Sequence, residues 1–179
     1  GSDPERRDVL LTHLHSDHTG LADRIVGKDR TIYIHKTDLD LLQIFRTTND
    51  PEFRYRRFVR EGFPAEDLAE MYRSNPAMTE KMDMSSCRFH ALKDSEVLQV
   101  GDYALETIFV PGHTPGNCMF YLRDEQILFC GDHVLFDITP NITWWPGVMD
   151  SLGDYIDSLK RFRDLPVRLS LPGHRKTGI

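Results

Sequence analysis

The sequence predicts a mixed α/β protein whose chemistry lies in loops that follow its strands. Apolar runs of strand length recur along the chain, and four of them lead directly into a loop that contains His or Asp. Residues 151–165 carry apolar side chains at helical spacing, a pattern typical of a helix that covers one face of a sheet. A chain of 179 residues buries about 70% of its unfolded surface, enough for one domain with a real core.

The first of these loops has the sequence THLHSDH and occupies residues 12–18. Alternate side chains of a strand point to one face, so His13 and His15 are expected to converge on one metal ion. Asp17 and His18, past the bend, are expected to reach a second ion. The alternative is a purely structural cluster, but burying so many unligated polar groups is costly, and clusters of this kind usually mark metal sites. We therefore predict a two-metal hydrolytic site.

Three later loops offer further candidate ligands, because two ions need more ligands than one short segment supplies. The segment PGHTPG contains His113, the segment GDH contains Asp132, and the segment PGH contains His174. Each follows a strand-like run, and loops at strand ends on a rigid sheet commonly carry chemistry.

This ordered set of segments resembles the metallo-β-lactamase superfamily, in particular its glyoxalase II-like and lactonase-like branch. The resemblance extends from about Asp8 to His174. It implies an αββα sandwich with a dinuclear site for divalent metal ions, with zinc favoured and iron or manganese as alternatives. It also implies three ligands for each ion and one bridging ligand. These are His13, His15 and His113 for the first ion, Asp17, His18 and His174 for the second, and Asp132 as the bridge.

Members of the resembling family have several strands and a helix before the first metal segment, and more sheet and helix after the last His. Here Asp3-Pro4 gives a helix-start signal with room for only one turn before the strand at residues 8–12. We therefore expect residues 1–179 to be one domain truncated at both ends, because an open sheet would leave strand edges unpaired. A reduced fold is the alternative.

Residues 20–27 are expected to form a short helix, followed by a strand at residues 31–34. This strand ends at His35, which we considered as a ligand. It has no Gly turn and no neighbouring acid, so a structural role is expected instead.

Residues 37–84 form a predicted helical insertion between the first and second metal segments. Helices are expected at residues 37–45, 52–60 and 65–73, separated by Pro-containing breaks. The insertion is expected to form a lid over the site. The second of these helices carries four arginines, Arg54, Arg56, Arg57 and Arg60. These arginines either bind an anionic substrate group or form a solvated charged face. The insertion also has aromatic residues that form either the apolar underside of the lid or a homodimer surface. These are Phe53, Tyr55, Phe58, Phe63 and Tyr72.

The segment after the insertion is β-rich. Short apolar runs separated by turn signals predict strands at residues 88–92, 96–100, 103–110, 117–122 and 126–130. The last two form a hairpin across Arg123-Asp124-Glu125, which brings the loop of His113 and Asp132 to the same edge of the sheet.

The segment that follows Asp132 is aromatic and rich in turn formers. Trp144 and Trp145 are expected either to line the substrate pocket or to pack in the core. His133 either supports Asp132 or has a structural role. Ser151 is expected to cap the helix that follows it, and a strand at residues 167–171 delivers His174.

Composition and charge argue against some classes of function, namely nucleic-acid binding and membrane spanning. The net charge of −6 gives no basic footprint for nucleic acid, so a nucleic-acid substrate is not expected. The sequence has no stretch of about 18 apolar residues and no leader before the first strand, which predicts a cytoplasmic protein without a membrane span. The sequence has an odd number of cysteines, which lack C-x-x-C spacing: Cys87, Cys118 and Cys130. We therefore expect buried thiols rather than disulfides. Cys130 could line the metal pocket but is not assigned as a ligand.

The predicted site defines a mechanism. Two divalent ions that share a water lower its pKa from about 15.7 toward neutrality, so a bridging hydroxide is available as the nucleophile. The ions also polarise the oxygen of the scissile carbonyl or phosphoryl group. Asp17 is the candidate catalytic residue, expected to orient this hydroxide and to move its proton.

We expect a small-molecule ester, thioester or lactone as the substrate. Glyoxalase II is a partial match, because its PGHTPG-type segment commonly continues with a further His where this chain has Asn117-Cys118. A phosphodiesterase or nuclease of the same fold is one alternative and would need a basic groove. A diiron redox module is another, but Glu typically stands there at the position of His15. A degenerate, non-enzymatic domain is the third alternative.

Overall fold

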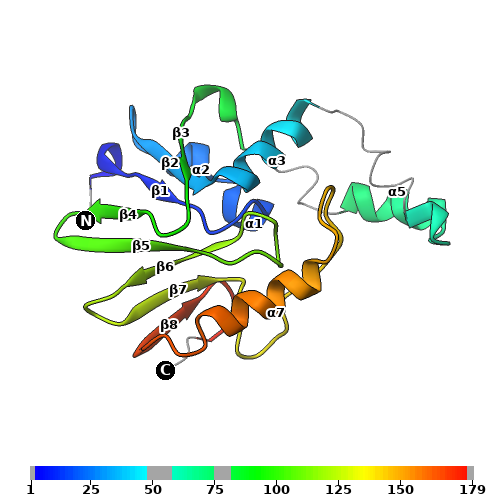
Figure 1. Cartoon of the computed structure of the whole chain (residues 1–179). Helices are drawn as coiled ribbons and strands as arrows, with labels where there is room; N and C mark the ends of the chain where they lie inside the picture. The colour runs from blue at the N-terminus through cyan, green and yellow to red at the C-terminus, as the bar shows by residue number, and fades with distance from the viewer. Residues whose placement is uncertain (1–2, 48–57, 75–81, 177–179) are drawn as a thin grey trace.

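The computed structural model describes residues 3–47, 58–74 and 82–176, which form two β-sheets and their covering helices (Figure 1). The first sheet is parallel and has the order β1 (Val9–Leu10), β2 (Thr31–His35) and β3 (Arg88–Leu92). The second has the order β4 (Val97–Val100), β5 (Tyr103–Phe109), β6 (Cys118–Leu122), β7 (Ile127–Gly131) and β8 (Leu169–Pro172). Neighbours in this sheet are antiparallel except β7 and β8, which are parallel.

Three apolar clusters define the layers. The outer face of the first sheet packs against α2 (Ala22–Ile25) and α3 (Lys36–Thr47) through Ala22 and Leu39. The outer face of the second sheet packs against Phe162 and Leu165, which follow α7 (Ser151–Arg161). Between the sheets lie Leu92, Leu105, Cys118 and Phe120. The order helix, sheet, sheet, helix is the predicted αββα sandwich.

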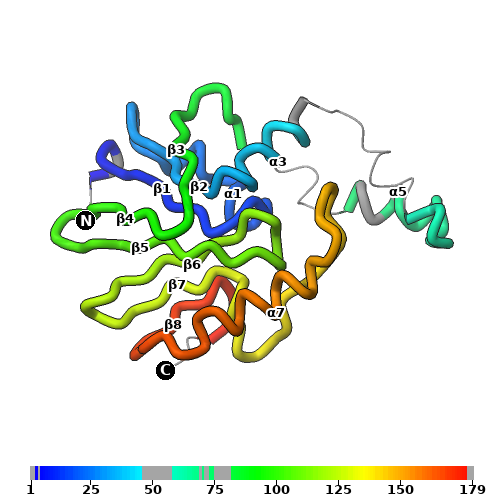
Figure 2. The backbone as a smooth tube through the Cα atoms, in the orientation of Figure 1, coloured from blue at the N-terminus to red at the C-terminus, as the bar shows by residue number. Residues whose placement is uncertain are grey.

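The strand register brings the site loops to one edge. Phe109 pairs with Cys118, so the hairpin loop of residues 110–117 lies at the edge where β7 ends. The amide of Cys118 donates to the carbonyl of Thr12 at 2.8 Å, which joins this loop to the end of β1. In the backbone trace of Figure 2, the chain reaches this edge first at the end of β1 and again at the loop between β5 and β6.

One local prediction was confirmed and one was wrong. The short helix expected at residues 20–27 is present as α2, and a further single turn, α1 (Ser16–Thr19), precedes it. This turn is stabilised by Thr19, whose amide and hydroxyl both donate to the carbonyl of His15, at 2.9 and 3.0 Å. The wrong prediction concerns α7, whose N-cap is Asp150 rather than Ser151, because the Asp150 Oδ1 accepts from the amide of Gly153 at 2.8 Å.

The insertion is described in part. It contains α3, a helical stretch at residues 58–60 and α5 (Ala65–Ser74), and α5 stands to one side of the sheets in Figure 1. Arg54, Arg56, Arg57, Phe53 and Tyr55 lie outside the described residues. Arg60, Phe58 and Phe63 are exposed. The lid and the homodimer stay predictions.

Cys118 and Cys130 are fully buried, as predicted, whereas Cys87 is half-buried, and all three are thiols. Within residues 3–47, 58–74 and 82–176, no helix combines the length and the apolar character that a bilayer crossing needs. The cytoplasmic location stays a prediction.

Candidate metal centre

The structure brings all seven predicted ligands together at one edge of the sandwich. They come from the end of β1 and from α1, from the β5–β6 loop, and from the segments after β7 and β8. They are His13, His15, Asp17, His18, His113, Asp132 and His174.

The first group is His13, His15 and His113, whose ligand atoms lie within 4.8 Å of one another. The Nε2 of His113 lies 2.9 Å from the Nδ1 of His15 and 3.2 Å from the Nε2 of His13. His13 and His113 are 0% and 3% exposed, so these nitrogens converge in a space that water barely reaches.

The second group is Asp17, His18 and His174, whose ligand atoms also lie within 4.8 Å of one another. The Oδ2 of Asp17 lies 3.1 Å from the Nε2 of His174 and 3.7 Å from the Nε2 of His18. The Asp17 side chain is 56% exposed, so this group forms the open side of the site.

Asp132 stands between the two groups. Its Oδ1 lies 3.2 Å from the Nε2 of His18. Its Oδ2 lies 3.2 Å from the Nε2 of His174 and 3.6 Å from the Nε2 of His113. One carboxylate therefore reaches both groups, as a bridging ligand would.

The donor atoms fit divalent cations. Among the described residues, the buried His18 Nε2 and Asp132 Oδ1 have no hydrogen-bond partner of good geometry. In the first group, the Nε2 of His113 faces nitrogens of both neighbours, and a single nitrogen cannot satisfy two others by proton sharing alone. Imidazole nitrogens and carboxylate oxygens are the ligands that zinc and other first-row metals take in proteins.

The electrostatics of the first group favour neutral imidazoles. Burial, together with the charge of His113, lowers the pKa of His15 to about 4. Burial also lowers the pKa values of His13 and His113. At His18, burial lowers the pKa, but the carboxylates of Asp132 and Asp17 outweigh burial and raise it. Because a metal ligand must be unprotonated, the first group is in its binding form at neutral pH.

The family model for the metallo-β-lactamase superfamily matches residues 5–174. The chain belongs to this superfamily. The match confirms the family resemblance and, with the layers described above, the fold expected from it.

Similar proteins support the same assignment. The probable metallo-hydrolase YqgX of Bacillus subtilis is 30% identical over 129 residues, which cover 72% of this chain and 49% of that protein. The human acyl-coenzyme A thioesterase MBLAC2 is 26% identical over 181 residues, covering 98% of this chain and 59% of that protein. The metallo-β-lactamase family protein TTHA1429 of Thermus thermophilus has a crystal structure that matches with a TM-score of 0.78 and 28% identity. That match covers 96% of this chain and 55% of TTHA1429. The chain thus spans between 49% and 59% of the lengths of these three proteins.

The loop after Asp132 holds His113 in place. The Nδ1–H of His113 donates to the carbonyl of Asn141 at 2.8 Å, which directs the Nε2 of His113 toward the other candidate ligands. The Nε1–H of Trp145 donates to the carbonyl of His113 at 3.1 Å. Trp145 is buried beside Leu14 and its ring lies 5.7 Å from that of His15. Trp145 therefore packs in the core, and Asn141 takes part through its backbone, which no sequence pattern marked.

We expect Trp145→Phe to lower the free energy of unfolding by about 1–3 kcal/mol. Phenylalanine keeps the apolar contacts but leaves the buried carbonyl of His113 without its donor. Denaturant unfolding of the metal-free protein measures this, and Trp144→Phe is the control. An equal free energy of unfolding for Trp145→Phe and wild type would show that this hydrogen bond does not stabilise the folded protein.

His35 and His133 belong to none of the candidate metal groups of the described residues. The ring of His35 stacks on Phe109 at 4.3 Å. His133 is fully buried with its ring 4.8 Å from Tyr155 and 5.5 Å from Phe162, and no hydrogen bond joins that ring to a described residue. The considered supporting role of His133 for Asp132 is therefore not seen. Cys130 belongs to none of the candidate metal groups of the described residues.

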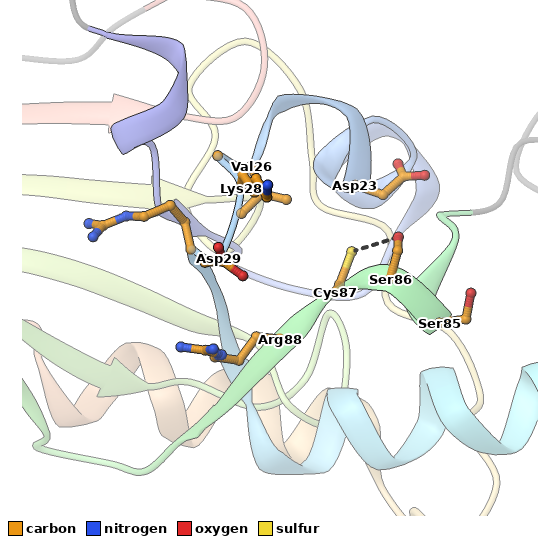
Figure 3. A pocket seen from close by; sticks show the side chains of 10 residues that line it. Asp23, Val26, Lys28, Asp29, Ser85, Ser86, Cys87 and Arg88 are labelled. Atoms are coloured by element: carbon orange, nitrogen blue, oxygen red, sulfur yellow. Dashed lines mark hydrogen bonds between the residues drawn. The ribbon is translucent and has the colours of Figure 1, made fainter.

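A hollow of about 460 Å³ lies away from this centre, where β2 and β3 begin (Figure 3). Lys28, Asp29, Ser86, Cys87 and Arg88 contribute to its lining, and Figure 3 shows the side chains of Ser86 and Cys87 in contact at one side of it. Because β1, β2 and β3 are parallel, this is the edge opposite to the one where β1 delivers His13. The hollow is therefore not part of the metal centre.

The metal-free protein is expected to lose stability as the pH falls from 6.5 toward 4. Burial lowers the pKa values of five histidines below 6.5, so the unfolded chain binds more protons than the folded chain in this range. They are His13, His15, His35, His113 and His133. The raised pKa values of His18 and Asp38 increase stability as the pH falls, but these are only two groups against the histidines with lowered pKa values. Urea unfolding with a chelator at pH 7.5 and pH 4.5 measures the difference, and higher stability at pH 4.5 would contradict it.

Proposed function

We propose that this protein is a dinuclear metal-dependent hydrolase that cleaves an acyl thioester, or a related ester or lactone, of a small molecule. One observation carries the proposal. Two three-residue groups of ligand atoms lie at one edge of the sandwich, and the carboxylate of Asp132 lies within 3.2–3.6 Å of members of both.

In this proposal His13, His15 and His113 hold one divalent ion. Asp17, His18 and His174 hold the second, and Asp132 contacts both. Zinc is the favoured metal, because the set is nitrogen-rich, and iron and manganese are alternatives. Bound ions of this kind supply a water of lowered pKa and polarise a carbonyl oxygen.

The chain's own residues orient the reaction. The buried first group is neutral at pH 7, so it holds its ligand atoms without competing protons. Asp17 lies on the open side, where its carboxylate accepts the proton of the attacking water and then passes it to the leaving group. The Nε2 of His174 lies 3.1 Å from the Oδ2 of Asp17, so both ligand atoms face the same place for the second ion.

An acyl thioester is the favoured substrate class for two reasons. A thiol has a pKa of about 8.5, so its thiolate leaves with little help from a general acid. Among the described residues, the candidate groups of the site are His and Asp side chains. The human relative is named as an acyl-coenzyme A thioesterase. A nucleic-acid phosphodiester is the alternative substrate, but it would need a basic groove along its backbone, and the net charge of −6 shows no excess of basic residues.

The test is turnover by the intact protein after loading with zinc, iron or manganese. The substrates are an acyl-coenzyme A thioester, a lactone, a β-lactam and a phosphodiester. We expect hydrolysis of the thioester, with or without the lactone, and loss of that activity with a chelator. Turnover of the phosphodiester alone would overturn the proposed substrate class. Equal turnover with and without metal would overturn the proposed chemistry.

A further inference from the structure

Asp38 is a buried carboxylate in the first turn of α3, and its side chain is 0% exposed. Isolated buried charges are costly unless hydrogen bonds compensate them. Here three donors meet the two oxygens. The Oδ2 accepts from the amide of Leu14 at 2.9 Å and from the hydroxyl of Thr114 at 2.7 Å. The Oδ1 accepts from the amide of Gly116 at 2.6 Å.

These donors belong to the two segments that carry the first group of candidate ligands. Leu14 lies between His13 and His15, and Thr114 directly follows His113. The donors are 24, 76 and 78 residues from Asp38 in the sequence. One carboxylate therefore joins the end of β1 in the first sheet to the β5–β6 loop of the second.

The contact with Gly116 leaves no room for a side chain. A Cβ at this position would lie 2.4 Å from the amide nitrogen of Asp38 and 2.5 Å from its Oδ1. The backbone of the loop is thus held directly against the carboxylate. Burial raises the pKa of Asp38 to about 6, although the three hydrogen bonds lower it, so the group is ionised at pH 7.5 and accepts from all three donors.

We infer that Asp38 is a positioning residue for the metal centre, which fixes the His113 loop against the His13–His15 segment and thereby sets the affinity of these three histidines for a divalent ion. This inference rests on the proposed function only in taking the three histidines as metal ligands. Asp38 itself touches neither substrate nor metal in this account.

The test is binding of cobalt(II) to the intact metal-free protein at pH 7.5, followed by visible absorption. In Asp38→Asn the amide nitrogen cannot accept, so Leu14 or Gly116 loses its acceptor. We expect one of two cobalt-binding steps to weaken by about 10- to 100-fold, the usual effect of removing a residue that orients a ligand. The other step is expected to stay within twofold of wild type. Asp40→Asn is the matched control, because Asp40 is on the same helix, is 49% exposed and pairs with Lys36.

Thr114→Val is the second variant, used because Asp38→Asn could fail to fold. It removes one donor and keeps the side-chain shape, so we expect a weakening of about 2- to 10-fold in the same step. Circular dichroism checks the fold of each variant. A folded Asp38→Asn with wild-type cobalt affinities overturns the inference, and so does an unchanged Thr114→Val if Asp38→Asn does not fold. Absence of cobalt binding by the wild type overturns it as well. Normal two-step binding without thioester hydrolysis would instead contradict the proposed function and leave this inference standing.

Discussion

Asp17→Asn is expected to lower the turnover number for the thioester by about 10²–10⁴, the usual contribution of a positioned acid or base. Asparagine has nearly the same shape but cannot accept a proton, and it is a weaker metal ligand. The fold should survive, because Asp17 is 56% exposed and its ionic contacts at the surface contribute about 1 kcal/mol or less.

The measurement is steady-state turnover of the metal-loaded variant, with thermal unfolding as the check on folding. Asp157→Asn is a suitable control, because Asp157 is an exposed acid that pairs with Lys160 on α7. Wild-type turnover in Asp17→Asn would remove Asp17 from the proposed catalytic role.

His113→Ala is expected to reduce the metal content from two ions to about one per chain. It removes one of three candidate ligands of the buried group and also the hydrogen bond to the carbonyl of Asn141. Turnover should fall by at least about 10²–10³, the loss that accompanies removal of a single group that stabilises charge in the transition state. Stability should fall by about 1–3 kcal/mol, because the carbonyl of Asn141 loses its donor.

Metal analysis after gel filtration, together with turnover, measures this. His35→Ala is the matched control, because His35 is also a buried histidine but stacks on Phe109 outside the centre. It should lose stability and keep both metals and turnover. Two bound ions in folded His113→Ala would exclude His113 as a ligand.

The seven candidate ligands could be identified from the sequence because each is part of a short segment that follows a strand. The direction of the preceding strand and the turn that follows it determine at which edge of the sheet such a segment lies. The order of the segments along the chain therefore predicts that they share one edge. The strand register of β5, β6 and β7 then brings His113 and Asp132 to the same edge, as the predicted hairpin required.

The supporting contacts could not be predicted in this way. Asn141 acts through a backbone carbonyl, which every residue has, and Asp38 acts through donors as far as 78 residues away. In the sequence, Asp38 resembles part of a helix-capping pattern, and nothing local indicates that its carboxylate is buried. The additional turn α1 depends on the hydroxyl of Thr19, which donates to the carbonyl of His15. Side-chain to backbone contacts of this kind compete with the simple periodic patterns that predict elements.

The most direct test of the central claim is a crystal structure of the metal-loaded protein with anomalous scattering measured at the absorption edge of the bound metal. The account predicts two anomalous peaks. One should contact His13, His15 and His113, the other Asp17, His18 and His174, and Asp132 should contact both. A single peak, or peaks away from these side chains, would contradict the dinuclear centre.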